Sequence, residues 1–162
     1  MPDVNVRRAT LADIPAIIAL DRQTPNAAHW SSLQYEARIG AEKLPMSESL
    51  ALIAEETLDS GTENATPAIF GFLVAHRVDK EWELENIVVA ENLRWRGIGS
   101  NLAKEFLKYA GNEMEQGVSL EVRESNKPAR AFYRKLGCKE MGRRKGYYSN
   151  PQEDCIICGM RL

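Results

Sequence analysis

The sequence predicts a mixed α/β fold: a single domain over residues 1–162, with a central mixed β-sheet flanked by about four helices. Length and composition are the first observation, because 162 residues, 44% hydrophobic and 27% charged, are typical of one globular domain. The order of segments is the second. Strand and helix patterns follow one another as β-α-α-β-β-β-α-β-α-β-β, and this incomplete alternation indicates a mixed sheet rather than a fully parallel one.

The first half of the chain carries the signals of strands and two helices. Residues 4–7 alternate apolar and polar side chains, which predicts a first strand. Residues 10–13 have the spacing of a capping box, with Asp in place of the usual Glu, and predict a helix that ends before Pro25. Ser31 or Ser32 is expected to cap a second helix. Three further strands are predicted over residues 50–54, 68–76 and 82–90, with an exposed loop at 57–67.

The second half begins with a glycine-containing turn and a long helix. Apolar residues at helical spacing predict that this helix continues to about Gln116, before Gly117. A clean alternation then predicts a strand over residues 118–123. Asn126 is expected to cap a shorter helix that carries Pro128 in its first turn. Two closing strands are predicted over residues 138–147 and 153–161.

Charge and cysteine content exclude several classes of protein. A net charge of −2 argues against a dedicated nucleic-acid binder, which needs a basic excess. Neither a signal peptide nor a membrane span is visible, so we expect a cytoplasmic protein. Cys155 and Cys158 lie three apart in a strand pattern and therefore point to opposite faces. We expect these two thiols and Cys138 to be buried and structural, with no metal site.

The turn at residues 94–99, with the sequence Arg-Trp-Arg-Gly-Ile-Gly, is the strongest chemical signal. It lies between an apolar strand and a long helix, whose N-terminus offers unpaired N–H groups to an anion. Glycine lets the backbone approach that anion closely, and two arginines add positive charge. The pattern is neither a Walker loop nor a Rossmann fingerprint. Taken alone, it equally fits a tight turn with exposed arginines.

This turn resembles the R/Q-x-x-G-x-G/A signature of the GNAT acetyltransferases, and two further segments are similar to the same family. They are Leu-Glu-Val-Arg-Glu-Ser-Asn at 120–126 and Ala-Phe-Tyr-Arg-Lys-Leu-Gly at 131–137. Within the family, the first of these segments resembles the bacterial ribosomal-protein-alanine N-acetyltransferases. The resemblance covers nearly the whole chain and implies a GNAT-like fold that binds acetyl-coenzyme A (acetyl-CoA) as co-substrate, without a metal.

The resemblance also implies the site residues. Glu121 would be the general base, although a strand-face Glu is more often only solvated. Tyr133 would protonate the leaving thiolate, the alternative being core packing. The acceptor would contact Trp30, Tyr147 and Tyr148. The cofactor would contact Ile87, Val88, Val89, Arg94, Trp95, Arg96, Gly97, Ile98, Gly99, Ser100, Asn126 and Arg130. Asn126 equally fits a helix cap, and Arg130 a solvated helix face.

The expected reaction is direct acetyl transfer in a ternary complex, to the N-terminal α-amine of a protein. At pH 7 about 10% of α-amines are neutral, against well under 0.1% of lysine amines, so an α-amine asks less of the base. A ribosomal-protein alanine is the favoured acceptor, and acidic residues at 81–85 and 153–154 would attract a basic tail. We expect neither nucleic acid nor membrane as a partner, and a monomer or weak dimer.

Three alternatives stay open at this point. The first is a GNAT enzyme for a small-molecule amine or a lysine side chain, which a deep closed pocket would favour over an open groove between Trp30 and Tyr147. The second is a non-catalytic acyl-CoA-binding module. The third is a partner subunit that assembles through an exposed strand edge.

Overall fold

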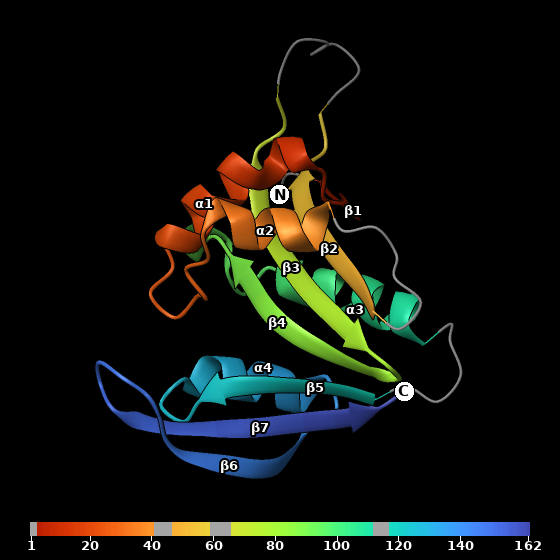
Figure 1. Cartoon of the computed structure of the whole chain (residues 1–162). Helices are drawn as coiled ribbons and strands as arrows, with labels where there is room; N and C mark the ends of the chain where they lie inside the picture. Colours follow the sequence, from red (N-terminus) through yellow and green to blue (C-terminus); the bar gives the residue numbers. More distant parts are fainter. Residues whose placement is uncertain (1–2, 41–46, 59–65, 112–116) are drawn as a thin grey trace.

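The chain folds around a single β-sheet. Its structure is a computed structural model that describes residues 3–40, 47–58, 66–111 and 117–162. Its strands are β1 (Val4–Arg8), β2 (Ser47–Glu56), β3 (Ile69–Val78), β4 (Glu81–Val89), β5 (Gly117–Arg123), β6 (Lys139–Tyr148) and β7 (Glu153–Arg161). They lie in the order β1-β2-β3-β4-β5-β7-β6 (Figure 1). Only β4 and β5 pair in parallel among these neighbours, so the prediction of a mixed sheet is confirmed.

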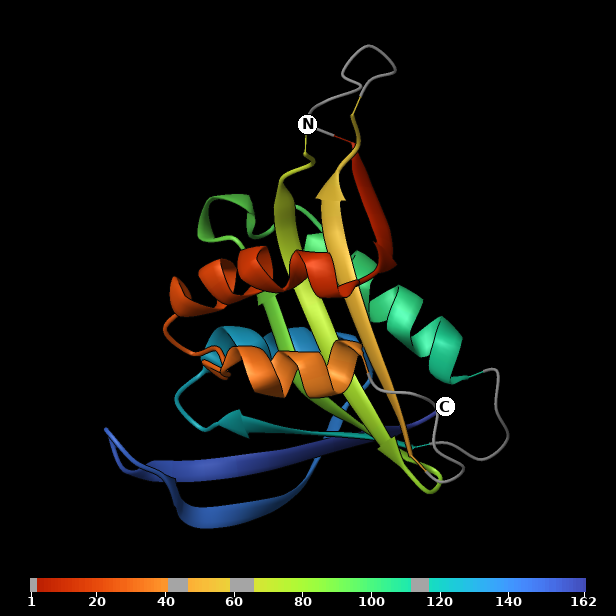
Figure 2. The same ribbon diagram turned by 45° about the horizontal axis from the view of Figure 1, so that its top comes forward.

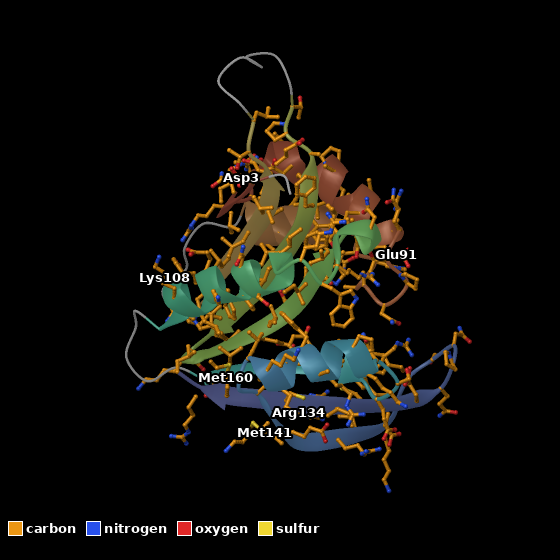
Figure 3. The ribbon with its side chains drawn as sticks, turned by 180° about the vertical axis from the view of Figure 1, so that it is seen from behind. Asp3, Glu91, Lys108, Arg134, Met141 and Met160 are labelled. Atoms are coloured by element: carbon orange, nitrogen blue, oxygen red, sulfur yellow. The ribbon has the colours of Figure 1, made fainter. Side chains whose placement is uncertain are left out.

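Helices cover both faces of the sheet. The helices are α1 (Ile14–Arg22), α2 (Ser32–Ile39), α3 (Ile98–Ala110) and α4 (Lys127–Lys135). The pair α1 and α2 covers one face, and α3 and α4 lie on the other (Figures 1 and 2). Figure 3, from behind, shows α3 and α4 together over that second face. Each face therefore has its own core: Ile17, Tyr35 and Phe72 belong to the α1–α2 core, and Leu102 and Phe106 to the α3–α4 core.

The predicted order of helices and strands is confirmed, with differences at their ends. Ser31 caps α2 as expected, and Asp13 accepts a hydrogen bond from the Thr10 amide at 2.7 Å. The strand predicted at 50–54 is longer, because β2 pairs with β3 from Ser47 to Glu55. Helix α3 ends at Ala110 rather than at Gln116, because Gly111, a poor helix former, follows it. Residues 112–116, and most of the predicted loop at 57–67, lie outside the described residues.

The parallel pairing of β4 with β5 is short. It joins residues 81–84 of β4 to residues 117–120 of β5 and then stops, and the two strands diverge (Figure 1). Glu85 is the extra residue of a β-bulge, where the register of β3 against β4 shifts between Val74 and Ala75. A bulge bends its strand and increases the local twist, which is how β4 leaves β5 while it stays paired with β3.

The three cysteines are buried and form no disulfide, as the sequence predicts. Within the described part of the chain, no group of His, Cys, Asp and Glu side chains has the arrangement of a metal site. Among the helices that the structure describes, none has both the length and the apolar character needed to cross a membrane.

A buried carboxylate, Asp21, ties the segment between α1 and α2 to the sheet. It is fully buried and accepts the backbone amides of His29 and Trp30, at 3.2 and 3.0 Å. Asn86 of β4 donates its side-chain amide to Asp21 at 3.5 Å and to the Tyr35 hydroxyl at 3.1 Å. Burial, followed by the charge of Asp21, raises the pKa of Tyr35. Asp21 therefore fixes the path of the backbone that carries Trp30.

We predict that Asp21→Asn lowers the free energy of unfolding by about 2 kcal/mol, because it places an amide NH₂ where buried N–H donors need an acceptor. Chemical denaturation measures this change. Asp79→Asn is the matched control, because Asp79 is exposed at the β3–β4 turn with φ 55°, a conformation that Asn tolerates. Equal destabilisation by the two substitutions would contradict the role given to Asp21.

Candidate active site

The turn before α3 offers backbone donors to an anion. Gly97 is the N-cap of α3 with φ 83°, and no side chain caps that end of the helix among the described residues. The first amides of a helix lack partners within the helix, so those of residues 98–100 point out of the helix end. A Cβ built at Gly97 would meet nothing within 4 Å, so the space beside Gly97 on that side is open. Free amides at a helix N-terminus fit an anion such as a pyrophosphate.

Neighbouring elements hold this turn in place. Ile98 is buried in the α3–α4 core. A Cβ at Gly99 would lie 3.6 Å from Phe132 of α4 and from Val89 of β4, so both elements pack beside the turn. Arg94 donates its Nε to the carbonyl of Val89 at 3.4 Å. The site of the expected anion is thus built on the end of β4 and the side of α4.

Trp95 has an unusual backbone conformation. Its φ is 67°, in the left-handed region that bulky side chains rarely adopt. Such a conformation costs on the order of 1–3 kcal/mol and persists only where surrounding structure enforces it. Its side chain is also 85% exposed. Arg96, the next residue, is exposed as well and adds positive charge beside the helix end.

The part of β4 beyond the bulge has one edge that β5 does not pair. Antiparallel pairing with β3 continues to Val89, while pairing with β5 ends at Leu84. Val88 points into the α1–α2 core, and Ile87 and Val89 pack against the α3–α4 core. Side chains of residues 87–89 are therefore engaged in packing, and what this edge offers a ligand is its backbone.

Glu121 lies at the point where the two strands separate. It follows Leu120, the last residue of β5 paired with β4, and is half-buried on the face of the sheet opposite α4. Arg144 of β6 forms an ion pair with its carboxylate at 3.0 Å. The charge of Glu121, and a hydrogen bond to it, raise the pKa of Tyr147. Two residues of β6 thus hold the side chain of Glu121.

Two further carboxylates lie near Glu121 on the same face. Partial desolvation of the Glu83 carboxylate raises its pKa, and repulsion from Glu85 and from Glu121 raises it further. Arg38 of α2 binds Glu85 in a bidentate ion pair, with both contacts at 2.7 Å. This face is therefore acidic around Glu121.

Tyr133 approaches β5 from the other side. It is 8% exposed and belongs to the α3–α4 core together with Val122, whereas Glu121 points to the opposite face of β5. Burial raises the pKa of the Tyr133 phenol, with smaller contributions from Cys138 and Cys158. The phenol is consequently protonated throughout the neutral range, as a proton donor must be.

Asn126 and Arg130 have structural contacts of their own. Asn126 caps α4 and accepts the Ala129 amide at 3.2 Å, which is one of the two roles considered for it. Arg130 donates to the Glu124 carbonyl at 2.9 Å and to the Glu140 carboxylate at 2.6 Å. These contacts use two of the five N–H donors of Arg130, and its buried Nε has no hydrogen-bond partner among the described residues.

Aromatic residues border the acidic face. The Trp30 ring lies 5.3 Å from Tyr35 and 5.8 Å from the Arg38 guanidinium. Tyr147 is 49% exposed and packs edge-on against Tyr148, with ring centroids 5.1 Å apart. Arg123 covers the Tyr148 ring at 4.3 Å.

The sequence predicts no role for several residues that the structure places at this site. Arg144 and Arg38 hold carboxylates of the acidic face, and Asp21 holds the backbone at Trp30. Arg144 lies in a basic run before two tyrosines, and that run was the available signal for it. Arg38 and Glu85 are 47 residues apart, so no local pattern connects them.

Comparison with known proteins places this chain in a family. A model of the Acetyltransferase (GNAT) family matches residues 18–138. A putative [ribosomal protein bS18]-alanine N-acetyltransferase from Bacillus subtilis is 33% identical over 75 residues, 46% of this chain and 50% of the relative. The N-alpha-acetyltransferase RimI of Mycobacterium tuberculosis is 40% identical over 68 residues, 42% of this chain and 41% of the relative. The chain thus matches half or less of these relatives' length.

A solved structure shares the fold over nearly the full length of both chains. The ribosomal-protein-alanine N-acetyltransferase from Escherichia coli superposes with a TM-score of 0.75 at 22% identity, over 99% of this chain and 94% of the other. The family match covers most of the chain, including the turn at Gly97, Glu121 and Tyr133. The chain belongs to the GNAT acetyltransferase family.

Proposed function

We propose that the chain is an acetyl-CoA-dependent N-acetyltransferase whose acceptor is the N-terminal α-amine of a protein, with a ribosomal-protein alanine favoured. One observation carries the proposal: β4 and β5 separate immediately before Glu121, and the unpaired edge of β4 leads from there to the turn at Gly97. An extended ligand along that edge would have a phosphate seat at one end and a carboxylate at the other.

The residues present fit such a ligand. Amides of residues 98–100 hold the pyrophosphate, and Arg94 and Arg96 add positive charge beside it. Acetyl-CoA, when bound, supplies the acetyl group as a thioester. Backbone N–H groups on the unpaired edge of β4 at residues 87–89 bind the pantetheine arm and stabilise the oxyanion that develops on the acetyl carbonyl.

Glu121 acts as the general base. The acceptor enters over the acidic face between Trp30 and Tyr147, and Glu121 accepts the proton of its ammonium, directly or through one water. The ion pair with Arg144 and the contact with Tyr147 orient the carboxylate. Glu83 contributes negative charge that attracts the cationic acceptor.

Tyr133 acts as the general acid. It belongs to the core on the α4 side of β5, and in this mechanism it donates its phenolic proton to the thiolate that leaves. Its raised pKa keeps the proton on the phenol until the thiolate develops. Base and acid therefore act from opposite faces of β5.

The acetyl group is transferred directly and not through an acetylated cysteine. Burial raises the pKa of Cys138 to about 11 and also raises the pKa values of Cys155 and Cys158. A buried thiol that stays protonated is a poor nucleophile. Direct attack of the amine in a ternary complex remains as the route that the other groups support.

An α-amine on a peptide suits the shape and charge of the acceptor face. Tyr147 is half exposed, and Glu83 is exposed beside the base, which leaves room for an extended basic segment. Two related proteins carry names for N-terminal α-amine or ribosomal-protein alanine acetylation, which supports the same acceptor. A ribosomal protein would be the partner, in the cytoplasm.

We predict that incubation with acetyl-CoA adds one acetyl group to the α-amine of a peptide that begins with Ala and continues with basic residues. Mass spectrometry with fragmentation locates the added group. A lysine peptide with a blocked N-terminus and a set of small primary amines serve as parallel acceptors. Acetylation of the lysine peptide or of the small amines alone would contradict the proposed acceptor. Binding of CoA without any acetyl transfer would contradict the proposed enzymatic activity.

Glu121→Gln is expected to lower kcat at neutral pH by roughly 10²-fold or more, because the amide cannot accept the ammonium proton. Steady-state release of CoA measures the rate. Glu124→Gln is the control: its carboxylate lies three residues away, pairs with Arg143 at 2.8 Å and has no role in the proposed mechanism. Unchanged turnover of Glu121→Gln would show that the base is another group.

Tyr133→Phe is expected to lower kcat by about 10²-fold while KM for the acceptor stays near that of the parent protein. The substitution removes the hydroxyl and keeps the ring that packs in the α3–α4 core. Equal melting temperatures of the two proteins would confirm that the core is intact. A fall in stability with no fall in kcat would assign Tyr133 to packing.

A further inference from the structure

Trp95 is the most exposed large hydrophobic side chain in the described part of the protein. It is 85% exposed, whereas Trp30 packs on Tyr35 and Trp82 packs on Phe106. None of the aromatic or cation–π contacts among the described residues includes Trp95. Packing within the chain therefore gives no reason for a tryptophan at this position.

The backbone at Trp95 makes the residue still less expected. Its φ of 67° suits glycine or asparagine, and a tryptophan there is a conformational outlier. Local backbone strain of this kind concentrates at functional sites, where the strained residue contacts a ligand. Trp95 thus combines an unfavourable backbone conformation with an exposed aromatic ring that packs against no other ring among the described residues.

The place of Trp95 in the turn indicates what it contacts. It lies two residues before Gly97, the N-cap beside the proposed pyrophosphate seat, and between Arg94 and Arg96. A pyrophosphate in coenzyme A joins the pantetheine arm to an adenosine 3′-phosphate. If the arm follows β4 away from the turn, the adenosine lies on the outer side of the seat, where Trp95 is exposed.

We propose that the Trp95 indole stacks on the adenine of coenzyme A, an inference that rests on the proposed function. An indole presents a flat apolar face to a planar base, and the flanking arginines attract the phosphates on either side of the ribose. Trp95 is therefore a specificity determinant for the nucleotide half of the cofactor. It has no part in acetyl transfer itself.

The test measures ligand binding rather than turnover. Trp95→Asn removes the ring and suits the left-handed backbone, so the variant is expected to melt at the same or a higher temperature than the parent protein. It is also expected to bind CoA about ten-fold more weakly by calorimetry. Its affinity for 4′-phosphopantetheine, which lacks adenosine, is expected to be unchanged. Trp95→Phe keeps an aromatic face and should bind CoA close to the parent.

Fluorescence gives a second readout. Adenine stacked on an exposed indole quenches its emission and shields it from iodide, so CoA should do both in the parent and neither in Trp95→Phe. Leu33→Asn is the control for replacing an exposed hydrophobic side chain by Asn, since Leu33 is 75% exposed on α2. Equal CoA affinity of the parent and Trp95→Asn, with a parent that binds CoA, would overturn the stacking alone. A parent that binds no CoA would overturn the proposed function as well.

Discussion

The early end of the pairing between β4 and β5 is the constraint on which the rest of the structure depends. Pairing stops after Leu84 and Leu120, and the bulge at Glu85 turns β4 away while β3 still holds its other edge. Because α3 and α4 bury their apolar faces in one shared core, the sheet stays a single body although two of its strands separate. Backbone N–H and C=O groups on this edge would cost free energy if they were buried without hydrogen-bond partners. A ligand bound along the edge would supply those partners.

The two ends of this separation differ in charge. Around Gly97 the exposed side chains are Arg94, Trp95 and Arg96, beside the positive end of the α3 dipole. At the other end, Glu121 lies with two further carboxylates, Glu83 and Glu85, and Arg38 and Arg144 pair with two of these three groups. Although the net charge of the chain is only −2, positive and negative side chains lie at different ends of this separation. The basic end suits a polyanionic ligand, and the acidic end suits a cationic acceptor. Half-buried pairs of this kind are screened less by salt than surface pairs are.

A structural feature can be predicted from the sequence when the residues that cause it lie close together in the chain. Periodicity and capping residues act within a few positions, so the order of elements, the cap at Ser31 and the burial of Cys155 and Cys158 could all be predicted. The length of a strand depends on its neighbours, and β2 exceeds its apolar segment for that reason. The separation of β4 from β5 and the Arg144–Glu121 pair are properties of the assembled sheet, and neighbouring residues contain no pattern for them.

The same separation would let the proposed base and the proposed acid, on opposite faces of β5, act on one bond. In a fully paired sheet the backbone ladder would stand between Glu121, on the α1–α2 side, and Tyr133, on the α4 side. Where β4 departs, that ladder is missing on one side of β5. A thioester lying in the sheet plane there would meet the carboxylate from one face and the phenol from the other. Opposite faces also keep the two groups in different environments, a solvated acidic surface and an apolar core. The apolar core thus keeps the proton on the Tyr133 phenol, because burial raises its pKa.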